Sequence, residues 1–135
     1  MVMDGQGGGI GAAIIKGLRD SLGSEVLILA LGTNSIATSR MMKAGANKGG
    51  TGENAIVQTS LRADIIIGPL AIIMANAMMG EVTAKMAEEV SSCAAKKLLI
   101  PLTQEKVRVV GTLNDPLPHL VGQVVEIVKE MNENV

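Results

Sequence analysis

The feature that most constrains the fold is an alternation of short apolar runs with stretches of helical spacing. Apolar runs occupy residues 2–4, 25–31, 64–68 and 97–102, and segments with helical spacing lie between or after them. This order is typical of βαβ units on a parallel sheet covered by helices on both faces. At 135 residues, the chain is long enough for one such domain with a real core. The sequence therefore predicts a single α/β domain of three layers over residues 1–135.

The helices are expected at six places along the chain. They are predicted over residues 10–22, 34–44, 53–62, 69–79 and 83–94, with a terminal helix that Asp115 caps and Pro116 begins. A short third strand is expected in the glycine-rich stretch before Glu53. Only Thr103 to Lys106 separate the run at 97–102 from Val107 to Gly111, too few for a crossover helix. We therefore predict a mainly parallel sheet of five or six strands, with residues 107–111 as an antiparallel edge strand. By analogy with other open α/β sheets, we expect the strand order 3-2-1-4-5.

Composition excludes several classes of function. The chain has no aromatic residue, so it lacks a stacking platform for single-stranded nucleic acid, and its net charge of -1 gives no general attraction to nucleic acid or membranes. No apolar run is long enough to span a bilayer, and no leader segment is expected. With one cysteine and one histidine, we expect no disulfide and no metal site. These observations predict a cytoplasmic protein without a nucleic-acid or membrane partner.

The stretch DGQGGGIG, residues 4–11, has five glycines in eight positions between a predicted strand and a predicted helix. A glycine-rich turn in this position lets the free N–H groups and the dipole of a helix N-terminus bind a phosphate group. The spacing of Gly5, Gly9 and Gly11 resembles the cofactor loop of the short-chain dehydrogenase/reductase family. That resemblance implies a tight turn at Gly5, approach of a pyrophosphate at Gly9 and close helix–sheet packing at Gly11.

The resemblance to that family covers about the first third of the chain. The catalytic tyrosine of the family has no counterpart here, and Asp4 replaces the threonine that usually precedes the first glycine. A carboxylate there is expected to bond an amide or hydroxyl of the loop or ligand, because it would repel a phosphate. The second strand ends in Gly32-Thr33-Asn34, without the acidic residue that holds an NAD ribose. Thr33 and Asn34 could accept a 2'-phosphate or another polar group.

The whole chain more closely resembles an uncharacterised family of small bacterial proteins, catalogued as a domain of unknown function. The stretches that carry this resemblance are DGQGGGIG, ALGTNSIATSRMMKAGA, GTGENA, ADIIIGP, MMGEVT and KKLLIPL. It runs nearly from end to end and implies a Rossmann-like fold, but it brings no reaction or ligand with it.

Ligands of open α/β sheets bind outside the carboxyl ends of the strands, where the strand order reverses. Four polar or glycine-rich segments are expected at that edge, and they form the candidate ligand site. Its residues are Asp4, Gly5, Gln6, Gly7, Gly8, Gly9, Ile10, Gly11, Gly32, Thr33, Asn34, Glu53, Asn54, Gly68 and Pro69. Glu53 could instead only favour the start of its helix. Glu81 is interpreted as a loop charge rather than a residue that reaches back to the site, His119 as a surface histidine, and Cys93 as a small buried side chain.

Three functions are consistent with these features. The leading hypothesis is a small protein that binds a nucleotide or dinucleotide, such as NAD(P), through the loop from Gly5 to Gly11. The second is an NAD(P)-dependent reductase whose remaining residues come from a partner subunit. The third is an assembly module in which the loop is only structural. We also expect a homodimer or larger homo-oligomer, because the predicted helix Leu70 to Met79 has only Asn76 to interrupt its apolar surface.

Overall fold

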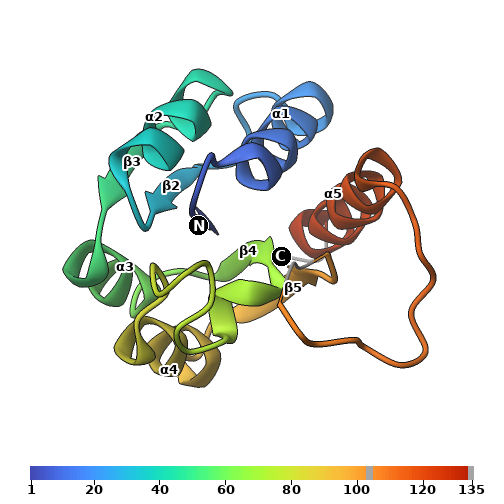
Figure 1. Cartoon of the computed structure of the whole chain (residues 1–135). Coiled ribbons are helices and arrows are strands. Elements are labelled where there is room, and N and C mark those ends of the chain that lie inside the picture. Colours follow the sequence, from blue (N-terminus) through green and yellow to red (C-terminus); the bar gives the residue numbers. More distant parts are fainter. Residues whose placement is uncertain (103–104, 134–135) are drawn as a thin grey trace.

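A computed structural model shows an α/β domain and describes residues 1–102 and 105–133. The strands are β1 (Val2–Asp4), β2 (Leu29–Gly32), β3 (Lys48–Thr51), β4 (Ile65–Pro69) and β5 (Lys96–Ile100). The helices are α1 (Gly9–Leu22), α2 (Ser35–Lys43), α3 (Glu53–Ser60), α4 (Ala84–Ser92) and α5 (Leu117–Glu133), with a short 3-10 helix η1 (Leu70–Ile73) after β4 (Figure 1).

The five strands form one sheet, in the order β3-β2-β1-β4-β5, and every pair is parallel. This is the predicted order. It reverses between β1 and β4, because the chain first winds outwards to β3 and then returns to the other side of β1. The carboxyl ends of β1 and β4 therefore flank the crevice where such sheets bind ligands.

Helices cover both faces of the sheet, and successive strand residues alternate between two cores. Val2, Ala30 and Ile67 face α1, α2 and α5, while Met3, Leu31 and Ile66 face α3, α4 and η1. Figure 1 shows α1, α2 and α5 on one side of the strands and α3 and α4 on the other. The arrangement is the predicted three-layer, Rossmann-like fold.

The predicted antiparallel edge strand is wrong. Residues 107–111 form no strand, and β5 pairs only with β4 within the described ranges. Val110 is 94% exposed, so this segment runs outside the sheet as part of the irregular connection to α5 (Figure 1). The prediction assumed that residues 107–111 form a strand beside β5, which a short turn would make antiparallel. They belong instead to a long connection that leads to α5, so no tight turn beside β5 is needed. Thr103 and Gln104 lie outside the described residues.

The predicted helix Pro69 to Met79 is also wrong. Only η1 is helical, and the chain then follows turns in which Asn76, Met78 and Met79 have positive φ angles of 68°, 57° and 56°. Most of its apolar side chains need no partner molecule, because Ile72, Ala77 and Met78 are buried in the core that α4 covers, although Met79 is 97% exposed. Because most of these side chains pack within the chain, the reason for expecting a subunit interface on this segment no longer holds.

Element boundaries differ less. β2 begins at Leu29 rather than Glu25, and Leu27 in the preceding segment is 67% exposed. α3 ends at Ser60, α4 at Ser92, and α5 begins at Leu117, one residue after the predicted Pro116. Asp115 lies 3.5 Å from Nδ1 of the exposed His119.

The packing of α1 on α5 generates a stability prediction. A Cβ on Gly17 would lie 2.7 Å from Cγ1 of Val121, whereas one on Gly122 of α5 would meet no atom within 4 Å. We expect Gly17→Val to lower the free energy of unfolding by about 1–3 kcal/mol through overpacking. The matched Gly122→Ala should raise it by roughly 0.5–1 kcal/mol, because alanine restricts the unfolded chain. Urea denaturation followed by circular dichroism measures both; equal effects would contradict the packing argument.

Candidate functional site

Asp4 joins the end of β1 to the start of α1. Its carboxylate is buried, with 4% of the residue exposed. Oδ1 accepts the N–H of Gly5 at 2.8 Å, and Oδ2 accepts the N–H of Gly11 at 2.7 Å. Asp4 therefore bonds amides of the loop, as predicted, and it takes a place at the helix N-terminus that a phosphate could otherwise occupy.

Burial dominates the ionisation of Asp4. It raises the pKa of this carboxyl above its ordinary value, although the N–H groups of Gly11, Gly5 and Ile10 and the charge of Arg40 act in the opposite direction. The carboxylate is thus stabilised by hydrogen bonds but kept from water.

Three loop glycines are required by contacts inside the chain. A Cβ on Gly8 would lie 2.8 Å from the Cα of Ala37, and this residue has a φ of 73° at the N-cap of α1. A Cβ on Gly11 would lie 2.5 Å from Sδ of Met41 and 2.9 Å from Cβ of Asp4. At Gly5, a Cβ would lie 2.6 Å from Sδ of Met78. Close packing explains the absence of a side chain at all three.

Gly7 and Gly9 are different. A Cβ on either would meet only the guanidinium of Arg40, at 3.8 Å and 3.4 Å, and neither residue has a positive φ. In the described part of the chain, no hydrogen bond engages the N–H of Gly7 or Gly9. Packing and backbone geometry therefore do not require glycine at these two positions.

A cavity of about 680 Å³ lies at the point where the strand order reverses. One wall is the loop from Asp4 to Ile10, and the other includes Pro69 at the end of β4 and Ala71 of η1. Asn76, Met78, Met79, Leu102 and Glu105 complete the lining. Arg40 of α2 is exposed at the other edge of the loop, where Nη1 lies 3.4 Å from the carbonyl oxygen of Gly7.

The structure brings only part of the predicted site to this cavity. Asp4 to Ile10 and Pro69 line it, whereas Gly68 packs against the backbone of Met3 between the strands. Gly32 is also closed off by its own chain, since a Cβ there would lie 2.7 Å from the carbonyl oxygen of Asn34. Glu53 and Asn54 begin α3 beyond the end of β3 and do not line the cavity.

Glu81 was interpreted wrongly from the sequence. Its Oε1 accepts the N–H of Gln6 at 2.8 Å, the hydroxyl of Thr33 at 2.7 Å and the amide of Asn34 at 2.8 Å. Partial burial acts to raise the pKa of Glu81, but the hydrogen bonds from Thr33, Gln6 and Asn34 outweigh it and leave this pKa below its ordinary value. The only sequence signal was an acidic residue after Met78-Met79-Gly80, with no spacing that linked it to the loop.

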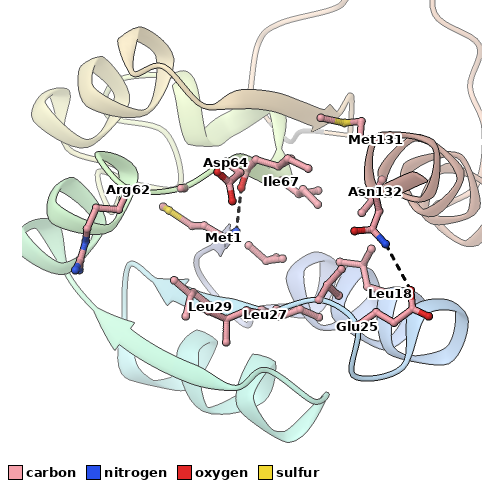
Figure 2. Close-up of a pocket in the computed structure, with 16 residues that line it drawn as sticks. Met1, Leu18, Glu25, Leu27, Leu29, Arg62, Asp64, Ile67, Met131 and Asn132 are labelled. Carbon is pink, nitrogen blue, oxygen red and sulfur yellow. Dashed lines mark hydrogen bonds between the residues drawn. The ribbon is translucent and has the colours of Figure 1, made fainter. Parts of the chain in front are cut away.

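A second cavity, of about 550 Å³, lies at the opposite edge of the sheet (Figure 2). It is bounded by the starts of β1, β2 and β4 and by Val128, Met131 and Asn132 of α5. Figure 2 shows mostly apolar side chains around it, with Glu25 and Asn132 bonded to each other. The amino ends of the strands are not where open α/β sheets bind their ligands.

Other predicted features have the following outcomes. Among the described residues there is no group of three or more histidine, cysteine or acidic side chains that could hold a metal ion. None of the helices described has the length and apolarity needed to cross a membrane. Cys93 is half-buried rather than buried, and its Sγ lies 3.4 Å from the carbonyl oxygen of Val90.

The two bonds of Asp4 give a prediction for stability against pH. Asp4→Asn cannot accept both N–H groups, so we expect it to lower the free energy of unfolding by about 1–3 kcal/mol. The raised pKa means that the folded chain keeps the Asp4 proton to higher pH than the unfolded chain. The advantage of the wild type over Asp4→Asn should therefore shrink as the pH rises from about 4 through the raised pKa. Urea denaturation at a series of pH values tests this, and an advantage that grows with pH would contradict it.

Comparison with known proteins identifies one family. No curated protein and no solved structure matches the chain. One family model does match, over residues 1–133, and its description is a domain of unknown function, DUF3842. That match covers nearly the whole chain and confirms the predicted resemblance to an uncharacterised family. The chain therefore belongs to the family described as the domain of unknown function DUF3842.

Proposed function

We propose that this protein binds a nucleotide, with its phosphate on the loop at Gly7 and Gly9. The observation that carries the proposal is the contrast among the loop glycines. Gly5, Gly8 and Gly11 are explained by packing. At Gly7 and Gly9, the atoms nearest an added Cβ belong to the Arg40 guanidinium, and no described residue accepts either N–H group. Both glycines line the cavity at the reversal of strand order. A ligand that must approach the backbone gives these glycines a reason.

The charges around the loop suit a phosphate at this place. The N-terminus of α1 supplies a positive dipole end, and the Arg40 guanidinium lies within reach of Gly7 and Gly9. Asp4 already uses the Gly11 amide, so the phosphate would bind towards Gly7 rather than deep on the helix axis. The cavity of about 680 Å³ has room for part of a nucleotide beyond its phosphate.

The other two hypotheses have less support. A reductase that uses NAD(P) would need a proton donor beside the substrate, and the ionisable residues that line the cavity are Asp4, which is bonded to the loop, and Glu105, which accepts the Met78 N–H at 2.7 Å. A partner subunit would have to supply that donor. A purely structural module would leave the glycines at positions 7 and 9 without an explanation.

A cytoplasmic location is part of the proposal that the protein binds a nucleotide, because nucleotides are abundant in the cytoplasm.

Nucleotide binding is tested by calorimetric titration with ADP, ATP, NAD, NADP, FMN and coenzyme A. We expect at least one to bind the wild type. Gly9→Val should abolish that binding without unfolding the chain, because the atoms nearest a Cβ there belong to the exposed side chain of Arg40. Arg40→Ala should weaken it about tenfold at low salt through loss of a charged hydrogen bond. Lys43→Ala, on the same helix, is the control. Unchanged affinity in Gly9→Val, or no binding by any of the six compounds, would overturn the proposal.

We further propose a homodimer, now built on the segment before α5. Val107, Val109, Val110 and Leu113 are between 39% and 94% exposed. Among the described residues β5 pairs on one side only, so an apolar segment and a free strand edge lie at the same side of the sheet. In a dimer with two-fold symmetry, each copy would cover the apolar segment and the free strand edge of the other copy.

Light scattering after size-exclusion chromatography tests the dimer at micromolar concentration. We expect the mass of a dimer for the wild type and a shift towards the monomer for Val110→Asp, because a charge would be buried in the interface. Gln58→Asp, which adds the same charge on the exposed side of α3, should stay dimeric. A monomeric wild type would show that the exposed valines serve no self-association.

A further inference from the structure

Glu81 crosses from the segment after η1 to the carboxyl end of β2. One of its carboxylate oxygens, Oε1, is fixed by three donors, from Gln6, Thr33 and Asn34. The second oxygen, Oε2, accepts no hydrogen bond from the described residues and is not buried. The carboxylate is therefore anchored by one oxygen and offers the other to solvent.

The backbone that carries Glu81 is held in an unusual conformation. Met78 and Met79 have left-handed φ angles, which cost energy for residues other than glycine and persist where the surroundings impose them. The Asn76 N–H donates to Val82, and the Glu81 N–H donates to Met78, both by backbone bonds that close the turn. The turn therefore presets the position of the Glu81 carboxylate before any ligand arrives.

Glu81 places a carboxylate near the end of β2, where the strand itself has no acidic residue. In dinucleotide-binding sheets an acidic residue at the end of the second strand bonds the ribose 2'-hydroxyl. Here β2 ends at Gly32 and is followed by Thr33 and Asn34, and Glu81 brings a carboxylate to these two residues from a different part of the chain. Glu81 does not itself line the cavity, but it bonds Gln6, which does, so it lies beside the loop proposed to hold the phosphate.

We propose that Oε2 of Glu81 accepts a hydrogen bond from the 2'-hydroxyl of the bound ribose, so that the site selects ribonucleotides with an unmodified 2'-hydroxyl. This inference rests on the proposed nucleotide function. A carboxylate favours a hydroxyl donor and repels a phosphate at the same place. The site should therefore reject 2'-deoxynucleotides, which lack the donor, and NADP, whose 2'-phosphate would meet the negative charge. Thr33 and Asn34, expected from the sequence to be available for a 2'-phosphate, both donate to Glu81 instead.

The wild type alone gives a first test that needs no variant. Calorimetric titration compares ADP with 2'-deoxy-ADP, and NAD with NADP. We expect each ligand with a free 2'-hydroxyl to bind about tenfold or more tightly than its counterpart, as for a hydrogen bond to a charged group. Equal affinity within both pairs would overturn the inference while leaving the nucleotide proposal intact. If none of the four compounds binds, and no other nucleotide does, the proposed function itself fails.

The variant Glu81→Gln changes the proposed interaction and little else. Its side-chain oxygen can still accept from Gln6, Thr33 and Asn34, while the second position becomes an N–H donor. We expect it to lose the preference for NAD over NADP, to within about twofold, because the amide can donate to a 2'-phosphate. Glu88→Gln, an exposed carboxylate on α4, should keep the preference. A loss of structure would lower the affinity for both ligands alike, so a preference that survives in a folded Glu81→Gln would overturn the inference.

Discussion

The buried carboxylate of Asp4 is the interaction on which the shape of the site depends. It accepts the N–H groups of Gly5 and Gly11, the first and last glycines of the loop, and so closes the turn between β1 and α1 from the inside. In related folds the helix N-terminus is left open for a ligand's phosphate. Here Asp4 accepts some of the N–H groups at the helix N-terminus, and these bonds fix the loop in the absence of ligand. Gly7 and Gly9 remain as the glycines whose backbone faces outwards.

The alternation of strands and helices, which indicates parallel pairing, could be recognised from local sequence features. The strand order was predicted by analogy with doubly wound sheets, and the structure has that order. Short apolar runs such as residues 65–68 contribute to the cores on both faces of the sheet, and stretches such as Ile10 to Leu22 carry one apolar stripe. Each type could therefore be recognised without knowledge of distant contacts. The glycine loop marked where the first strand gives way to the first helix. These features placed Asp4 to Ile10 and Pro69 at one edge of the sheet, where the structure has them.

The remaining features depend on contacts between distant parts of the chain. The segment from Leu70 to Met79 has an apolar composition that fits a helix, but burial under α4 and the turn at Met78 and Met79 determine its structure. The contact of Glu81 with Thr33 joins residues 48 positions apart, and no spacing in the sequence indicates it. In the sequence Arg40 is one of two exposed cations on its helix, and only the fold brings it to Gly7. For the same reason Val107 to Gly111 could be given strand propensity but not a partner strand.

The glycine loop illustrates how a structure separates two reasons for the same residue. In the sequence, the resemblance to a cofactor loop implied roles for Gly5, Gly9 and Gly11 only, and nothing distinguished Gly7 from Gly8. Contacts with Met78, Ala37 and Met41 account for three of the five glycines, so a fold without any ligand would still require glycine there. The other two lie where a side chain would fit, beside a guanidinium and along an open cavity. The case for a ligand thus rests on Gly7 and Gly9 alone, and it is stronger for being confined to the positions that packing leaves unexplained.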